Sequence, residues 1–374
     1  MRKWLFNLHW LLGISAGLVI AVVGLTGGML SLQPQILQWL NPGIITIAPQ
    51  NAAQSPEELL DKVQQQVPEK STAGLTLYRQ PTLAAEVRFR PEKGQRRGES
   101  QYLNPYSGEL LGQPQGRQLF IDIMRLHRWL LAGDVGKQIV GAATIILIFL
   151  CLSGLYFRWP KGKKRWQPGY WLAWRPGKSG RPFWWQLHAV IGTWLLPLYL
   201  LACLTGLYWS YEWYRDGLYQ LSGVERPQRS QSADNGVSAE STALDAYWSV
   251  FENTVTDYKK ATLQLPVGDT FTVVYLPADA RHERANNLWQ LDTDSMRVIQ
   301  HKLFSDKPLN ERLMSSILPL HSGEYFGWPG LIAMMLASLL MPVFFISGWY
   351  LYLSRKKRQR ITIEKNRAAA PGTA

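Results

Sequence analysis

The sequence predicts a membrane α-helical protein with four transmembrane helices, two duplicated halves and two small α+β domains outside the membrane. Three observations predict this class. The chain has four long apolar stretches, its basic residues gather at places that alternate with the long polar segments, and a Leu-His dipeptide recurs with matched spacings.

Each apolar stretch is long enough to cross a bilayer, since a transmembrane helix needs about 20 mostly apolar residues. The first stretch is too long for the apolar core of a signal peptide, and no small-residue cleavage site follows it, so we expect a retained span. The remainder of the 374-residue chain is polar enough to form domains outside the membrane. The predicted spans are Leu8–Leu32, Gln138–Phe157, Phe183–Tyr211 and Gly330–Leu353.

The net charge of +13 would indicate nucleic-acid binding if it were spread over one soluble domain, but its placement indicates membrane topology instead. Arg2 precedes the first span, and the loop Arg158–Arg181 is basic without any acidic residue. After the fourth span, five of the six residues 355–360 are basic. Positive charge favours the cytoplasmic side of a membrane. We therefore expect a multi-pass protein of the bacterial inner membrane with both termini cytoplasmic, segments 33–136 and 212–328 outside, and no nucleic-acid partner.

An internal duplication is marked by the Leu-His dipeptide, which occurs before or at the start of each span. His9 and His188 each stand 17 residues before a Thr-Gly pair, and His127 and His321 each stand 26 residues before a Ser-Gly pair. Glycines follow at four residues after the first two histidines and at six after the other two. The chain therefore predicts two halves of the same orientation, as in a parallel repeat.

Each predicted outer domain begins with a helix, continues with β-like runs and ends in a strand–turn–strand. The turn centres Asn-Pro-Tyr-Ser-Gly and Asp-Thr-Asp-Ser are typical of tight turns. An amphipathic run then leads into the next span and predicts a helix on the outer membrane surface. In order, the first domain has Ser55–Val67, Leu75–Tyr78, Ala85–Arg90, Tyr102–Leu111 and then Leu119–Leu131, and the second has Ser241–Tyr258, Ala261–Leu265, Thr270–Leu276, Leu288–Val298 and then Leu309–Leu320.

Histidine in a membrane span is uncommon and usually functional, although one alone is as well explained by a hydrogen bond between helices. Here four stand at repeat-equivalent places. At about 1.5 Å rise per residue, His9 and His188 lie within the cytoplasmic leaflet, whereas His127 and His321 lie near the outer surface. Depth thus groups the histidines into two pairs, one near each face of the membrane. Each pair contains one histidine from each half of the chain. Two neutral imidazoles facing across a gap suit a six-coordinate haem iron.

Neighbouring residues fit a haem but also have simpler explanations. Gly13 and Gly192 come four residues after a histidine on one helix face, where they either clear room for a flat macrocycle or only allow close helix packing. Arg125 and Arg128, with Arg2, are candidates to pair with haem propionates, but lone arginines beside a span mostly mark topology. The many tryptophans in these regions indicate mainly an interfacial belt.

Other metal or disulfide chemistry has weaker support. Zinc sites take three or four clustered ligands, and the chain has no His-x-x-His or Cys-x-x-Cys. His282 and His301 lie in the second outer domain without partner spacing, and we expect both at the surface. Cys151 and Cys203 lie in spans near opposite faces, so we expect no disulfide and outer domains held by packing alone.

The run Leu126-His127-Arg-Trp-Leu-Leu-Ala-Gly133 resembles the signature of the PepSY-associated transmembrane proteins. The span ending in Ser-Gly-Leu-Tyr-Phe-Arg-Trp-Pro160 and the outer helix-plus-hairpin units are similar too, and the resemblance covers about 1–355. Within that family, segment order and length resemble the inner-membrane ferric-siderophore reductases. The resemblance implies PepSY-like periplasmic domains, two haem b groups, and as haem ligands His9, His127, His188 and His321.

Spans, charge and repeat together predict eight segments. These are a first transmembrane helix with a cytoplasmic N-terminus (1–32), a periplasmic PepSY-like domain (33–117), an interfacial helix with the second transmembrane helix (118–157), a basic cytoplasmic loop (158–182), the third transmembrane helix (183–211), a second PepSY-like domain (212–308), an interfacial helix with the fourth transmembrane helix (309–353) and a basic cytoplasmic tail (354–374).

The resemblance implies an oxidoreductase that reduces ferric siderophores on the periplasmic side and releases Fe2+. No G-x-G-x-x-G follows a strand and no Walker loop occurs, so we expect the electron donor to be a quinol or a cytoplasmic reductase. Three alternatives remain: a haem electron-transfer subunit for a partner enzyme, a non-redox ligand-binding or regulatory protein, and an iron or siderophore permease. The permease is disfavoured because the predicted spans carry no acidic residue.

Overall fold

The computed structural model divides into two compact units. The membrane unit comprises Met1–Ser31, Ile121–Gly217 and Leu320–Ala374, and the sheet unit comprises Leu32–Phe120 and Leu218–Pro319. The structure describes residues 2–50, 52–92, 98–160, 162, 167–171, 173–226, 243–265 and 267–368.

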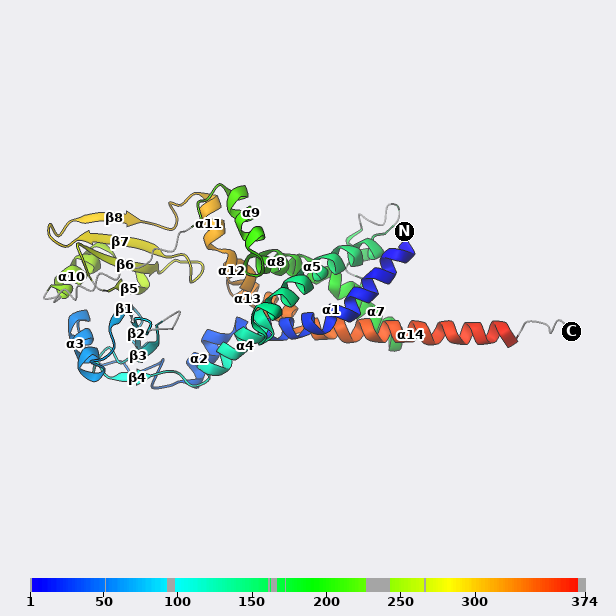
Figure 1. Cartoon of the computed structure of the whole chain (residues 1–374), viewed down its shortest axis with the longest axis horizontal. Helices are drawn as coiled ribbons and strands as arrows, with labels where there is room; N and C mark the ends of the chain where they lie inside the picture. Colours follow the sequence, from blue (N-terminus) through cyan, green and yellow to red (C-terminus); the bar gives the residue numbers. More distant parts are fainter. Residues whose placement is uncertain are drawn as a thin grey trace. The chain divides into compact units, whose positions relative to one another are not determined.

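The membrane unit contains four helices that are long and apolar enough to cross a bilayer, which confirms the predicted spans. The first span, α1 (Arg2–Ser31), packs along α5 (Gly133–Arg158) and along the fourth span, and α5 also packs along α8 (Gly192–Ser210) (Figure 1). Large apolar side chains such as Leu18 are exposed on these helices, as expected of surfaces that face lipid. The spans are Arg2–Ser31, Gly133–Arg158, Gly180–Ser210 and Glu324–Glu364.

Two of the spans are not regular α-helices. The third consists of α7 (Gly180–Gln186), a π-helical turn Leu187–Ile191 and α8. The fourth begins with a 3-10 turn and then breaks between α13 (Gly327–Leu339) and α14 (Met341–Ala368). The sequence did not predict either interruption.

The break in the fourth span comes just before Pro342, which has no backbone N–H to donate. The Tyr199 hydroxyl donates to the Ala337 carbonyl at 2.9 Å, so this carbonyl at the break has a partner inside the bundle. Tyr199 and Ala337 form a buried cluster with Met341, which fixes the place where the two helices meet.

The sheet unit contains one antiparallel sheet of eight strands in the order β4-β3-β2-β1-β5-β6-β7-β8. At its centre β1 (Thr72–Tyr78) pairs with β5 (Tyr258–Gln264), with Leu75 opposite Leu263. The sequence predicted two small α+β domains, and the structure joins their strands edge to edge. The outer strands are β2 (Ala85–Phe89), β3 (Ser100–Leu103), β4 (Leu110–Gly112), β6 (Thr270–Pro277), β7 (Asn287–Asp292) and β8 (Val298–Lys302).

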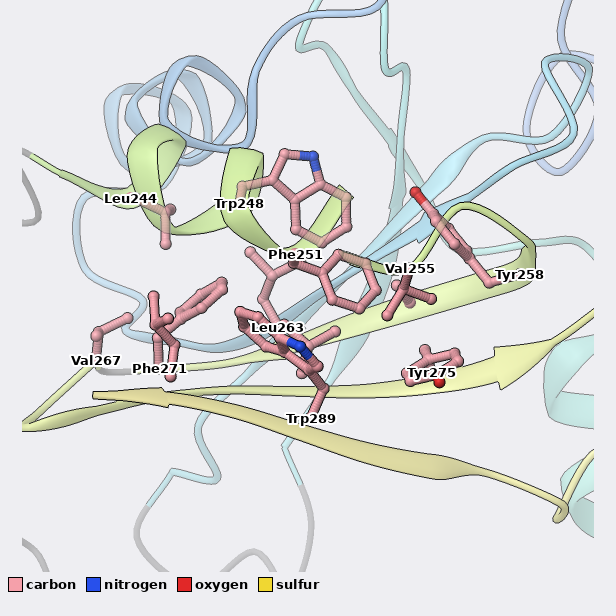
Figure 2. Close-up of a cluster of buried hydrophobic side chains, with 13 residues drawn as sticks. Leu244, Trp248, Phe251, Val255, Tyr258, Leu263, Val267, Phe271, Tyr275 and Trp289 are labelled. Carbon is pink, nitrogen blue, oxygen red and sulfur yellow. The ribbon is translucent and has the colours of Figure 1, made fainter. Parts of the chain in front are cut away.

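Two helices cover the sheet and each builds a hydrophobic core against one half of it. The first, α3 (Pro56–Gln66), starts with a capping box in which the Ser55 hydroxyl accepts from the Glu58 N–H. The second, α10 (Leu244–Thr254), places Phe251 beside Trp289, with ring centres 5.4 Å apart (Figure 2). The fully buried residues of the α3 core include Leu59, Val63, Leu75, Val87 and Leu103.

Several predicted boundaries shift. The hairpins are confirmed as β3–β4 and β7–β8, but the predicted helix Ser241–Tyr258 ends at Thr254, and its first two residues lie outside the described residues. The first amphipathic run forms α4 (Arg117–Trp129), which ends where Leu130 and Leu131 adopt positive φ. The second run is split into α11 (Leu309–Ser315) and α12 (Ile317–Ser322). Three further helices were not predicted: α2 (Gln33–Leu40), α6 (Pro168–Trp171) and α9 (Glu212–Ser222).

Candidate haem-ligand site

All four predicted histidines lie in the membrane unit, and each is bonded in the same way. In every case the Nδ1 of the ring is within hydrogen-bond distance of a serine or threonine hydroxyl on another helix. These hydroxyls belong to the Ser-Gly and Thr-Gly pairs whose spacing marked the repeat. The contacts are His9 to Ser153 at 2.7 Å, His127 to Thr26 at 3.3 Å, His188 to Ser347 at 2.9 Å and His321 to Thr205 at 2.9 Å.

The direction of these hydrogen bonds follows from the hydroxyls. Each hydroxyl donates its single hydrogen to a carbonyl of its own helix, as Ser153 does to Phe149 at 2.7 Å. It therefore accepts from the imidazole, and Nδ1 carries the ring's hydrogen. The Nδ1 of His127 also lies 2.9 Å from the Val23 carbonyl oxygen, which only accepts. The corresponding hydroxyl donations are Thr26 to Val22, Thr205 to Leu201 and Ser347 to Phe344.

This assignment leaves Nε2 of each neutral ring with its lone pair and without a hydrogen. An Nε2 lone pair with the opposite nitrogen held by a second residue is the usual state of a metal-binding histidine. All four hydroxyl residues are buried, so the arrangement is protected from water.

The glycine that follows each of these serines or threonines leaves space for the imidazole that the hydroxyl contacts. A Cβ on Gly27 would lie 2.9 Å from the Cε1 of His127, closer than real side chains approach. At Gly206 the corresponding distance to His321 is 3.3 Å, and at Gly154 and Gly348 the distances to His9 and His188 are each 3.6 Å. Each Ser/Thr-Gly pair thus holds one imidazole through the hydroxyl and leaves space for it at the glycine.

The structure brings His127 and His321 together, with ring centres 6.3 Å apart and ring planes at 67°. Two metal–nitrogen bonds of about 2 Å in line, with roughly 1.1 Å from each nitrogen to its ring centre, span about 6.2 Å. The separation of this pair therefore fits one metal ion held between two imidazoles. Among the described residues, no group of three or more His, Cys, Asp or Glu side chains could hold a metal ion.

His9 and His188 each lie beside the ring of a phenylalanine. The ring of His9 meets Phe157 edge-on at 5.7 Å, and the ring of His188 meets Phe344 edge-on at 5.6 Å. His188 lies in the π-helical turn, a type of distortion that is frequent at functional sites. The two phenylalanines do not occupy equivalent places of the repeat, because Phe157 follows Ser153 by four residues and Phe344 precedes Ser347 by three.

The glycines and arginines predicted near the ligands have other contacts. A Cβ on Gly13 would be in ordinary contact with Leu150 at 3.8 Å, and one on Gly192 would be 3.2 Å from the ring of Phe344. Both glycines therefore allow close approach of a neighbouring helix. Arg125 forms an exposed ion pair with Asp122 at 3.3 Å, and the guanidinium of Arg128 lies 4.7 Å from the ring centre of Trp129.

One prediction about the remaining histidines was wrong. His282 was expected at the surface but is buried, and its Nε2 lies 3.0 Å from the Ser316 hydroxyl. Ser316 stands at the break between α11 and α12, which sequence periodicity did not reveal, so this partner could not be foreseen. His301 is exposed on β8, where its Nε2 lies 2.7 Å from the Tyr275 hydroxyl.

A buried arginine that the sequence did not reveal, Arg158, supports the His188 turn. Arg158 ends α5, and its guanidinium donates to the Ala189 carbonyl at 2.8 Å and to the Thr193 hydroxyl at 3.1 Å. It also donates to the carbonyls of Tyr170 and Trp171, and these four acceptors compensate its burial. Its place at the end of an apolar span indicated only topology, because the acceptors come from distant residues.

A comparison with protein-family models matches residues 6–355 to the PepSY-associated transmembrane region. The chain belongs to this family. The matched region contains all four spans up to Arg355 and all four histidines, and no curated protein matches the chain. The PepSY-associated transmembrane region therefore includes every Ser/Thr-Gly pair described above.

Proposed function

We propose that the chain is a haem-dependent electron-transfer protein that binds two haem b groups and reduces ferric siderophores. His127 and His321 would hold one group, and His9 and His188 the other. The observation that carries the proposal is the repeated hydrogen bond from Nδ1 to a buried hydroxyl, which leaves four Nε2 lone pairs available.

The residues of the chain do three things in this proposal. The Ser/Thr-Gly pairs fix the ring orientation, and their hydrogen bonds raise the basicity of the imidazoles. The apolar spans exclude water, so the neutral form of each ring is favoured. Haem held by these imidazoles would supply one-electron transfer.

The substrate follows from the resemblance to siderophore reductases. The hydroxamate or catecholate oxygens of a siderophore hold Fe3+, a hard ion, far better than Fe2+. One electron, given by a quinol or a cytoplasmic reductase, converts Fe3+ to Fe2+ and weakens the complex. The basic end of the spans would lie in the cytoplasm of a bacterium and the sheet unit in the periplasm, as the charge distribution favours.

The proposal is tested by anaerobic mixing of the purified, dithionite-reduced chain with a ferric hydroxamate siderophore. We expect reoxidation of the haem absorption bands with release of Fe2+ that a ferrous chelator traps. The gallium(III) complex of the same siderophore is the matched control. It has the same shape and charge as the iron(III) complex, but Ga3+ accepts no electron under these conditions. Pigment that stays reduced with the iron complex would favour a subunit serving another enzyme, and a chain without a Soret band would favour a non-redox protein.

A further inference from the structure

A pocket with three arginines lies at the end of the membrane unit where α14 continues beyond its apolar part. Arg181 comes from α7, and Arg355 and Arg358 come from α14. Neutral side chains of α14 complete the wall. They are Gln359, Thr362 and Ile363, so the lining described by the structure contains no carboxylate.

Among the described residues that line this pocket, no carboxylate balances the three arginines. Like charges that share one pocket repel one another, by an amount that grows as water is excluded. The Nε of Arg181 is buried and has no hydrogen-bond partner among the described residues. A buried donor without a partner costs free energy.

Arg355 is held in place from the opposite side. Its guanidinium lies 4.5 Å from the ring centre of Phe6 in α1, a cation–π contact that fixes the arginine without neutralising it. The pocket is therefore arranged by two other helices of the membrane unit, α1 and α7, around the basic start of the α14 extension.

We propose that this pocket binds a phosphate group, namely the headgroup phosphate of an acidic phospholipid. Guanidinium groups match phosphate oxygens with paired N–H donors, and Gln359 and Thr362 offer further hydrogen bonds. The inference does not depend on haem or on the proposed reaction, because none of the four histidines belongs to the described lining of the pocket.

The position of the pocket favours a lipid over free phosphate. Residues 341–354 of α14 carry no charge, and Arg355 is the first charged residue after them, which places the guanidinium groups at headgroup level. Basic pockets between transmembrane helices on that side of a membrane bind phosphate-bearing headgroups.

The test uses the full chain in nanodiscs of phosphatidylcholine with added cardiolipin or phosphatidylglycerol, and native mass spectrometry to count retained acidic lipid. Arg181→Gln and Arg358→Gln should each weaken retention roughly tenfold, the effect of losing one hydrogen bond to a charged group. Arg360→Gln is the matched control, because it removes the same charge from α14 outside the pocket lining. Circular dichroism confirms that each variant is folded.

The outcomes separate the sources of phosphate. Loss of acidic lipid in the two pocket variants but not in Arg360→Gln supports the proposal. Displacement of the lipid by micromolar inorganic phosphate would show that the pocket binds free phosphate and would overturn the proposal of a lipid ligand. Equal retention in all variants, or an equal loss in Arg360→Gln, would overturn the site itself.

Discussion

Gly27 lies directly against the imidazole of His127, so that a Cβ on the glycine would be 2.9 Å from the ring's Cε1. Gly27→Ala must therefore push the ring from its position, whereas Gly154→Ala, whose Cβ would be 3.6 Å from His9, makes only ordinary contact. We expect Gly27→Ala to lose about half of the bound haem and Gly154→Ala to keep nearly all of it. The pyridine haemochrome assay measures both, and equal haem content in the two variants would contradict the predicted contact.

Removal of a hydroxyl tests the role of the Ser/Thr-Gly pairs. Ser153→Ala takes away the acceptor for the Nδ1 hydrogen of His9. Loss of such a supporting hydrogen bond typically weakens metal binding about 10–100-fold, so transfer of haem to an acceptor protein should accelerate to that extent. Ser15→Ala is the control, because among the described residues the Ser15 hydroxyl donates to the Leu12 carbonyl of its own helix and contacts no histidine. A Ser153→Ala variant with an unchanged transfer rate and an unchanged reduction potential would show that this hydroxyl does not position the ligand.

The core of the sheet unit depends on Phe251, which is fully buried against Trp289, Tyr258 and Tyr275. Phe251→Ala removes a buried aromatic ring and leaves a cavity, which should lower the free energy of unfolding by about 3–5 kcal/mol. Leu221→Ala, at a side chain that is 88% exposed, should change it by less than about 0.5 kcal/mol. Denaturant unfolding followed by tryptophan fluorescence measures both, and similar values for the two variants would contradict this description of the core.

Burial of His282 predicts a pH dependence of stability. Its pKa is lowered from 6.5, first because burial disfavours the charged ring and second because Arg284 is nearby. Above pH 6.5 the ring is neutral in both the folded and the unfolded chain. As pH falls below 6.5 only the unfolded chain takes up the proton, so stability declines, by at most about 1.4 kcal/mol per pH unit.

The change His282→Gln should remove this part of the pH dependence while keeping a hydrogen-bonding partner for Ser316. Thermal unfolding at pH 5.5 and pH 7.5 measures the difference, which should be smaller in the variant than in the wild-type chain. An undiminished difference in the variant would mean that His282 takes up its proton equally in both states.

The spans, the outer hairpins and the places of the four histidines in the membrane unit could be predicted because their signals are local. Apolar length identifies a span, turn residues identify a hairpin, and the Leu-His dipeptide repeats within a few residues of each span. The Ser-Gly and Thr-Gly pairs were also visible, but only as spacing. Their role as partners of the histidines depends on two helices packing side by side, as α1 and α5 do.

The features that escaped prediction depend on contacts between distant residues. Pairing of β1 with β5 joins strands whose residues Leu75 and Leu263 are far apart in the chain. Burial of Arg158 depends on carbonyls of α6 and of the His188 turn. The break before Met341 has a local cause in Pro342. However, α8 continues through Pro197, so a proline alone does not predict where a helix breaks.

The central claim is that the four imidazoles hold two haem groups. Each group is held by one imidazole from each half of the chain. The most direct measurement is the haem content and the oxidised and reduced spectrum of the purified chain, with His9, His127, His188 and His321 changed to alanine one at a time and His301→Ala as control. The account predicts two low-spin b-type haems in the wild type and in the control, and one in each of the four variants. A colourless wild-type chain made with ample haem, or full pigment after loss of His127 or His321, would contradict it.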